Sequence, residues 1–179
     1  MWVFGYGSLI WDGWETAFRC TDKVIATLYG YRRDFNKASV RNWGSKSIPG
    51  PTLGLEASAS AKCVGMAFNF PDEEQGCILK ELRAREGGSF TLPKKDVSLT
   101  SGVIVRAVVP INDPSKSTYL GNRTFKERAR LAAIATGSSG RCVDYVKTIR
   151  DKLEVLGIHD PGVEEFWKLV LRAKRTSRA

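Results

Sequence analysis

The first candidate for chemistry is a glycine-containing segment close to the N-terminus. The apolar residues 2–4 predict a buried strand, and Gly5-Tyr6-Gly7-Ser8 follows it before apolar character returns at residues 9–11. Two glycines two positions apart allow a sharp turn and leave backbone N–H groups uncovered by a Cβ. Such amides could hold a carboxylate or a developing oxyanion. A dinucleotide-binding fingerprint is excluded, because it needs a third glycine where this chain has Ile10. An ordinary glycine-containing turn is the alternative.

The second candidate is Glu86, an acidic residue at the C-terminal end of a predicted helix. The helix is expected over residues 71–86 and ends at Gly87-Gly88. The negative end of the helix dipole disfavours a carboxylate there. This should raise the pKa of Glu86 and suit it to act as a general base and acid near neutral pH. The alternative is a solvated glutamate paired with Arg83 or Arg85.

The composition is that of a globular protein large enough to bury a core. The 179 residues are 42% hydrophobic and 26% charged, and the N-terminus lacks a basic leader. No apolar run reaches the ~20 residues of a membrane span. We therefore expect a cytoplasmic protein. The formal net charge of +9 favours an anionic partner. Part of this charge comes from basic residues expected at a solvated helix end: Arg172, Lys174, Arg175 and Arg178.

The cysteines and the single histidine do not have the pattern of a metal site. The cysteines are far apart and form no C-x-x-C pair, so they lack zinc-ligand spacing. We expect free thiols in a reducing compartment at Cys20, Cys63, Cys77 and Cys142. His159 lies in a predicted turn between helices and is expected to be structural. We therefore expect no metal and no cofactor.

A mixture of strands and helices must position these residues. Hydrophobic patterning predicts strands over residues 2–4, 23–31, 52–57, 61–70 and 96–110, and helices over residues 71–86, 124–135, 141–156 and 160–175. Residues 12–20 and 36–51 are expected to be loops, the second long enough to be a binding loop. The pattern predicts one α+β domain over residues 1–179, with a mixed or antiparallel sheet and a helical C-terminal third.

Local signals predict how two helices begin and where the sheet is tightly packed. Asp72 with Gln75, and Thr124 with Glu127, have the spacing of capping boxes. Gly65 lies within a predicted central strand and allows another group to approach the backbone closely.

Several blocks, taken in order, resemble the ChaC-type gamma-glutamylcyclotransferase family. The N-terminal signature corresponds to Val3-Phe4-Gly5-Tyr6-Gly7-Ser8-Leu9-Ile10-Trp11. The later blocks are Gly30-Tyr31-Arg32-Arg33-Asp34-Phe35, Pro49-Gly50, Leu82-Arg83-Ala84-Arg85-Glu86, Tyr119-Leu120-Gly121, Gly137-Ser138-Ser139-Gly140 with Tyr145, and Leu156-Gly157-Ile158 with Asp160-Pro161. The resemblance covers nearly the whole chain, and the ordered combination of blocks is specific.

This resemblance implies a curved sheet that closes to a small barrel, with helices packed outside and the site at one mouth. It also implies cleavage of a gamma-glutamyl amide without water. The substrate's alpha-amine attacks its own side-chain carbonyl and releases 5-oxoproline and, from glutathione, Cys-Gly. The partner is then a small gamma-glutamyl molecule rather than a nucleic acid or a membrane. By resemblance Glu86 transfers the proton, and substrate contacts come from Phe4, Gly5, Tyr6, Gly7, Ser8, Leu9, Arg41 and the hydroxyl of Tyr119.

The chain departs from the family pattern in loops expected to face the substrate beyond its glutamyl group. Asn36-Lys37 replaces a common Trp, Arg41-Asn42-Trp43-Gly44 replaces a His-Arg-Gly or Arg-Gly arrangement, and Cys142 replaces a common Asn. A cyclotransferase for another gamma-glutamyl amine is therefore an alternative to a glutathione enzyme. A non-catalytic basic module that binds an acidic peptide or nucleic acid is the other alternative, although no nucleic-acid motif is present. The sequence does not predict an oligomeric state.

Overall fold

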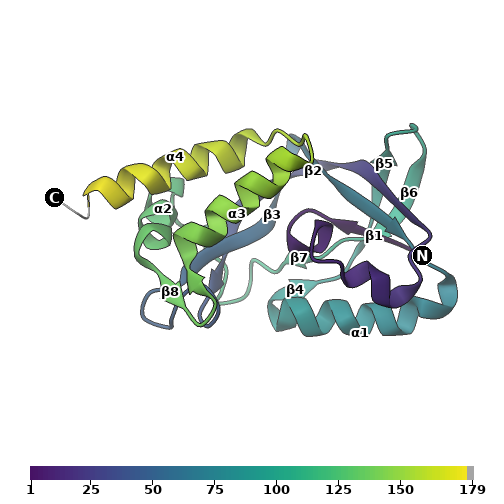
Figure 1. The fold of residues 1–179 in the computed structure, drawn as a ribbon, viewed down its shortest axis with the longest axis horizontal. Helices are drawn as coiled ribbons and strands as arrows, with labels where there is room; N and C mark the ends of the chain where they lie inside the picture. Colours follow the sequence, from purple (N-terminus) through teal and green to yellow (C-terminus); the bar gives the residue numbers. More distant parts are fainter. Residues whose placement is uncertain (177–179) are drawn as a thin grey trace. The chain divides into compact units, whose positions relative to one another are not determined.

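The computed structural model describes residues 1–176 (Figure 1). Its internal contacts form two compact units, which are considered one at a time. The first unit comprises residues 1–32 and 57–113, and the second comprises residues 33–56 and the chain from residue 114. A single domain over the whole chain stays a prediction.

A closed, mixed barrel is the central sheet, which confirms the predicted fold class. Its strands lie in the order β1-β3-β2-β5-β6, with bounds β1 (Trp2–Gly5), β3 (Gly50–Asn69), β2 (Asp22–Ser39), β5 (Lys94–Leu99) and β6 (Ile104–Val108). Strand β1 pairs antiparallel with β3, where Val3 lies opposite Phe68, and parallel with β6, where Val3 lies opposite Val108. These three side chains are buried, so the inward-facing residues of the strands form an apolar core.

One helix, four short turns and a strand pair complete the first unit. Helix α1 (Gln75–Glu86) follows β3 and buries Ile78 and Leu82. The other elements are the 3-10 turns η1 (Ser8–Ile10), η2 (Trp14–Phe18), η3 (Asp72–Glu74) and η4 (Gly87–Ser89), and the paired strands β4 (Phe90–Thr91) and β7 (Ile111–Asn112).

The second unit is mainly helical, as predicted for the C-terminal third of the chain. Its helices, green to yellow in Figure 1, are α2 (Phe125–Ile134), α3 (Cys142–Val155) and α4 (Pro161–Thr176). A short hairpin of β8 (Thr136–Gly137) and β9 (Gly140–Arg141) precedes α3.

The second half of β2 holds these helices through aromatic and charged contacts. Phe35 stacks on Phe166 of α4 with 4.2 Å between ring centroids. The adjacent Asp34 accepts a hydrogen bond from Arg128 of α2 at 2.6 Å, and both side chains are almost completely buried. The paired charges in this part of the core therefore compensate each other's loss of hydration.

Several predicted boundaries are wrong because the two long strands extend beyond their hydrophobic patterns. The predicted loop over residues 36–51 is confined to residues 40–49, since β2 continues to Ser39 and β3 begins at Gly50. The strands predicted over residues 52–57 and 61–70 are one strand, because β3 continues through the small, largely exposed residues 57–60. Apolar alternation fades there although the chain stays extended.

Two further predictions of local structure are also corrected. The strand expected over residues 96–110 is the antiparallel hairpin of β5 and β6, which turns at Gly102 with φ +86°. The loop expected over residues 12–20 contains the 3-10 turn η2, in which Trp14 is buried against Phe68 and Phe70. A scattered aromatic pattern has no helical period, so it did not reveal this turn.

One predicted capping box forms and the other does not. The side chain of Thr124 accepts from the amide of Glu127 at 3.2 Å, and the Glu127 carboxylate accepts from the amide of Thr124 at 2.7 Å. Asp72 instead pairs with the amino group of Met1 at 2.9 Å, and α1 begins at Gln75 without a side-chain cap. The N-terminal ammonium thus binds the Asp72 carboxylate, which the sequence pattern predicts to cap the helix.

The predictions for the glycines after two helices, for the start of the last helix and for the cysteines are confirmed. Glycines with positive φ follow the ends of α1 and α3, and α4 begins at Pro161. The four cysteines are free thiols. Within residues 1–176, none of the helices combines the length and the apolar character needed to cross a membrane. Lys174 and Arg175 lie in the last turn of α4, whereas Arg178 lies outside the described residues.

Candidate active site

The glycine-containing turn after β1 is shaped by close packing against β3. A Cβ on Gly65 would lie only 2.3 Å from the carbonyl oxygen of Gly5. A Cβ on Gly5 would in turn lie 3.0 Å from the Cβ of Leu9. Space therefore requires glycine at position 65 and leaves little room for a side chain at position 5, and the close approach predicted at Gly65 is confirmed.

Most side chains of this predicted substrate-binding segment are buried. Phe4 is 0% exposed and lies in the barrel core, and Tyr6 and Leu9 are also buried. Gly7 is partly exposed and Ser8 is exposed. The buried side chains therefore fix the path of the backbone, and the exposed surface of the segment is at Gly7 and Ser8.

The backbone of the turn presents donors rather than acceptors. The carbonyl oxygen of Gly7 accepts from the amide of Ile10 at 3.0 Å, and that of Leu9 accepts from Nε1 of Trp14 at 3.1 Å. Within residues 1–176, the amides of Gly7, Ser8 and Leu9 donate to no acceptor, because the first amides of a helical turn have none within it. The arrangement suits an anion.

Glu86 is the last residue of α1 and is partly exposed. Leu82, one turn earlier, is 0% exposed and holds this end of the helix in the first unit. Gly87 ends the helix with φ +68°. Arg85 donates a hydrogen bond to the carboxylate of Asp12, which lies just after η1. The last turn of α1 is therefore bonded to the chain that leaves the glycine-containing turn.

Residues 110–113 provide a second connection between that turn and the chain around Glu86. The hydroxyl of Tyr6 donates to the carbonyl oxygen of Pro110 at 2.8 Å. Strand β7 follows directly and pairs with β4, which begins shortly after Glu86. Glu86 and the glycine-containing turn thus belong to one hydrogen-bonded framework within the first unit.

Tyr119 lies in the second unit, where its hydroxyl donates to Oε2 of Glu56 at 2.7 Å. Nδ2 of Asn36 donates to the same oxygen at 2.8 Å and to the carbonyl oxygen of Leu55 at 3.2 Å. Burial, together with the hydrogen bond to Glu56, raises the pKa of Tyr119 to about 12. The hydroxyl proton is therefore directed to Glu56, whereas the resemblance directs the hydroxyl to the substrate.

The sequence did not single out Glu56, and it indicated Asn36 only as a departure from the family pattern. Asn36 is 0% exposed, and a buried side-chain amide needs hydrogen-bond partners. An asparagine within a predicted strand would therefore indicate a buried polar contact. The predicted loop over residues 36–51 concealed this signal, because a loop asparagine is normally solvated. Its partner Glu56 is also on a different strand, and strand pairing cannot be read from local patterns.

Arg41 lies in the second unit, in a loop whose backbone is held in place. The carbonyl oxygen of Arg41 accepts from the amide of Ser138 at 2.8 Å. A Cβ on Gly137 would lie 2.4 Å from that oxygen, so the contact with the β8–β9 hairpin is very close. Trp43 packs against Tyr145 with 5.2 Å between ring centroids. The loop is therefore anchored, while Arg41 itself is exposed.

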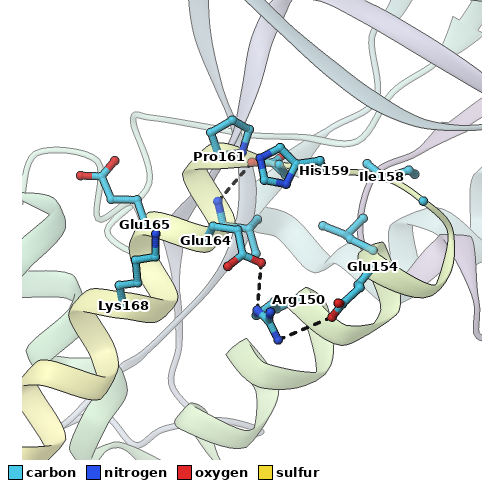
Figure 2. Close-up of a pocket in the computed structure, with 12 residues that line it drawn as sticks. Arg150, Glu154, Ile158, His159, Pro161, Glu164, Glu165 and Lys168 are labelled. Carbon is cyan, nitrogen blue, oxygen red and sulfur yellow. Dashed lines mark hydrogen bonds and ion pairs between the residues drawn. The ribbon is translucent and has the colours of Figure 1, made fainter.

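A pocket of about 640 Å³ lies between the end of α3 and the start of α4 and contains none of the predicted site residues (Figure 2). Arg150 in this pocket pairs with Glu164 at 2.8 Å and with Glu154 at 3.6 Å, so its charge is balanced locally. His159 lies in the adjoining turn. Among residues 1–176, no three His, Cys, Asp or Glu side chains are grouped so that they could hold a metal ion.

Two solved structures with a similar fold are described as gamma-glutamylcyclotransferases. A crystal structure of the yeast gamma-glutamylcyclotransferase specific to glutathione superposes with a TM-score of 0.85 at 20% identity, covering 97% of this chain and 99% of that one. A second structure, titled gamma-glutamyl cyclotransferase, superposes with a TM-score of 0.51 at 12% identity, covering 94% and 98%. The chain therefore has the gamma-glutamylcyclotransferase fold.

The sequence matches the model of the family described as ChaC-like protein over residues 1–173, and the chain belongs to that family. Gamma-glutamylcyclotransferase 2-3 of Arabidopsis thaliana is 32% identical over 175 residues, covering 93% of this chain and 86% of the relative. The glutathione-specific gamma-glutamylcyclotransferase of Escherichia coli is 30% identical over 168 residues, covering 93% and 71%. These relatives are enzymes, and the family is one of gamma-glutamylcyclotransferases.

Proposed function

We propose that the chain is a gamma-glutamylcyclotransferase that converts glutathione to 5-oxoproline and Cys-Gly in the cytoplasm. Family membership supports the reaction class, and the name of the Escherichia coli relative supports the substrate. The four free thiols support a reducing compartment. The partner in this proposal is a small gamma-glutamyl molecule, and the reaction as written uses no metal or cofactor.

The proposed reaction closes a five-membered ring within the substrate. The alpha-amine nitrogen attacks the side-chain amide carbon, and Glu86 accepts the proton that the amine loses. Glu86 returns this proton to the leaving nitrogen as the carbon–nitrogen bond breaks, so no water is consumed. Proton transfer of this kind contributes about 10²–10⁴-fold in rate. Attack within one bound molecule also draws on the high effective concentration of intramolecular reactions.

The backbone amides of Gly7, Ser8 and Leu9 are proposed to bind the substrate carboxylate or the carbonyl oxygen as it gains negative charge. Loss of one such donor typically costs about 3 kcal/mol of transition-state stabilisation. The remaining proposed roles are supported by the family resemblance: the backbone path is set by Phe4, Gly5 and Tyr6, and further substrate contacts are made by Arg41 and Tyr119.

One observation chiefly supports this proposal. The three amides of Gly7, Ser8 and Leu9, and the last turn of α1 that carries Glu86, belong to one hydrogen-bonded framework of the first unit. Cyclisation requires an anion-binding group and a proton acceptor, and these are the two kinds of group found there. Glu86 also lies at the C-terminal end of α1, as the sequence predicts.

A cyclotransferase for another gamma-glutamyl amine is the second candidate. Residues 41–44 depart from the family pattern, and the loop that carries them is anchored to the β8–β9 hairpin. A loop held in this way keeps its unusual side chains in defined places, so the departure could change which leaving group is accepted.

The deciding experiment measures 5-oxoproline release from glutathione by the wild-type protein and by Glu86→Gln, with Glu81→Gln on the same helix as the control. We expect turnover by the wild type and the control, and a loss of about 10²-fold or more in kcat for Glu86→Gln. Turnover of other gamma-glutamyl amines but not of glutathione would move the chain to the second candidate. A wild type inactive on the whole panel, or a fully active Glu86→Gln, would overturn the proposal.

A further inference from the structure

Helices α2 and α4 of the second unit pack against each other and line a pocket of about 640 Å³, here called the α2–α4 pocket (Figure 1). Among the described residues, three cations and no carboxylate line it: Lys126 and Arg130 from α2, and Arg172 from α4. None of the residues proposed for cyclisation lines this pocket. It therefore differs in charge from the pocket of similar volume between α3 and α4, in which carboxylates and cations are mixed (Figure 2).

The three cations of the α2–α4 pocket are not balanced by ion pairs. In the part of the chain that the structure describes, none of them pairs with a carboxylate, whereas Arg150 in the other pocket pairs with Glu164 at 2.8 Å. The only carboxylate in α2 is that of Glu127, and it accepts instead from the amide of Thr124 at 2.7 Å and from its hydroxyl at 2.8 Å. The fold therefore leaves this positive charge without an ion-pair partner.

Local preferences oppose this grouping of positive charge. Lys126 is the second residue of α2, where the positive end of the helix dipole disfavours a cation. Arg130 follows four residues later on the same face of the helix, so the two like charges repel each other. A bound anion would relieve both effects. Arginine keeps its positive charge at neutral pH and matches the oxygens of a carboxylate or phosphate with two parallel N–H groups.

Much of the remaining wall of the α2–α4 pocket is apolar. Ile134 lies four residues after Arg130 on α2 and is 53% exposed. Leu169 and Ala173 line the pocket from α4 and are half-buried. The volume lies within the range of about 300–1,000 Å³ that is usual for small-molecule pockets. Cations and apolar side chains in one pocket suit a molecule that has a negatively charged head and a short apolar chain.

We propose that the α2–α4 pocket binds an amphipathic anion, whose head is held by Lys126, Arg130 and Arg172 and whose chain packs on Ile134 and Leu169. Three cations favour a phosphate monoester, which carries about 1.5–2 negative charges at pH 7, over a carboxylate with one. Two sources present this chemistry: a free organic phosphate and a membrane lipid with a phosphate monoester as its headgroup. The pocket binds the same head and chain in either case.

The binding test uses octyl phosphate below the concentration at which it forms micelles, with inorganic phosphate as the head alone and octanol as the chain alone. The protein is labelled with nitrogen-15 and titrated by NMR, so that the amides whose signals shift locate the site. We expect saturable shifts centred on residues 126–134 and 169–176, and a Kd for octyl phosphate at least about tenfold below that for either part. Shifts centred on the pocket between α3 and α4, or no gain over inorganic phosphate, would overturn the proposal.

Matched variants at exposed positions separate the head from the chain. Arg130→Gln combined with Arg172→Gln should raise the Kd for octyl phosphate at least about tenfold, because two charge-assisted contacts are lost. Ile134→Ser should raise the Kd for octyl phosphate and leave that for inorganic phosphate unchanged. The control combines Lys46→Gln with Lys152→Gln, which removes the same net charge from the second unit outside the pocket. An equal loss in this control would show that net charge alone attracts the anion, and would overturn the site.

Vesicles separate the two sources of the anion. The wild type and the variant lacking both arginines are sedimented with phosphatidylcholine vesicles that contain or lack phosphatidic acid, whose headgroup is a phosphate monoester. Binding that needs both phosphatidic acid and the two arginines would identify a membrane lipid, and octyl phosphate binding without vesicle binding would identify a free organic phosphate. A protein that binds neither would overturn the proposal and leave the proposed cyclisation standing, because 5-oxoproline release is measured separately.

Discussion

Gly65 of β3 faces the carbonyl oxygen of Gly5 with no room for a side chain between them. The next-nearest group to a Cβ at this position is the ring of Phe4, at 2.7 Å. We therefore expect Gly65→Ala to displace the glycine-containing turn, to destabilise the protein by about 1–3 kcal/mol, and to lower kcat/KM. Thermal unfolding and 5-oxoproline release measure the two effects.

The matched control is Gly76→Ala in α1. A Cβ on Gly76 would meet nothing within 4 Å, and alanine is favoured over glycine in a helix by up to about 1 kcal/mol. Gly76→Ala should therefore leave activity unchanged and raise stability slightly. If Gly65→Ala behaved in the same way as Gly76→Ala, the close approach of β3 would play no part in shaping the turn.

A second prediction concerns the bond between Tyr6 and Pro110. Tyr6→Phe removes the hydroxyl that donates to the buried carbonyl oxygen of Pro110, and a buried acceptor without a donor costs about 1–3 kcal/mol. We expect a lower melting temperature and a lower kcat/KM, because the bond connects the glycine-containing turn to the chain around Glu86. Tyr29→Phe is the control, since Tyr29 is 64% exposed. Equal melting temperatures for the two variants would contradict the prediction.

The parts of the site that the sequence could predict are those set by local backbone chemistry. Glycine spacing indicated the turn at residues 5–8, and the two glycines after Glu86 indicated the helix end that carries it. The close approach at Gly65 could also be predicted, because a glycine within an apolar strand often marks a place where another group contacts the backbone. These signals depend on neighbours in the sequence, and the structure confirms the turn, the helix end and the close approach.

Features that depend on distant partners could not be predicted in the same way. Asp72 has the spacing of a helix cap, yet it pairs with the amino group of Met1, which is distant in sequence. Glu56 has no local pattern at all, and its carboxylate accepts hydrogen bonds from Asn36 on another strand and from Tyr119, which is distant in sequence. Residues 57–60 lack apolar alternation, so one long strand was interpreted as two. In each case a tertiary contact outweighs the local preference.

The four thiols should react at different rates because they differ in burial. Cys77 is exposed, whereas Cys63 and Cys142 are 0% exposed, and burial raises the pKa of the Cys142 thiol to about 12. At about pH 8 a thiol reagent should modify Cys77 first, Cys20 more slowly, and the buried pair only when the protein unfolds. Peptide mapping by mass spectrometry measures the order. Fast labelling of Cys142 in the native protein would contradict its burial.

The pH dependence of Cys142 follows from the direction of its shift. The folded pKa lies above the ordinary value of 9.0, so folding favours the neutral thiol. The stability from this group is fully present below about pH 9 and is lost as the pH rises toward about 12. Cys142→Ala should therefore reduce the alkaline loss of stability, as measured by the urea midpoint between those pH values. The control is Cys77→Ala, which should leave the alkaline loss as in the wild type.

The final prediction separates a buried ion pair from an exposed one. Asp34 and Arg128 have side chains that are 3% and 5% exposed, whereas Asp96 and Arg106 are 67% and 64% exposed. Asp34→Asn leaves the Arg128 charge buried without its partner and should cost about 3–5 kcal/mol. Asp96→Asn removes a hydrated pair and should cost no more than about 1 kcal/mol. Urea unfolding of both variants at neutral pH provides the comparison. Equal losses would mean that the Arg128 charge is hydrated or compensated by other groups, and that Asp34 does not hold α2 against β2.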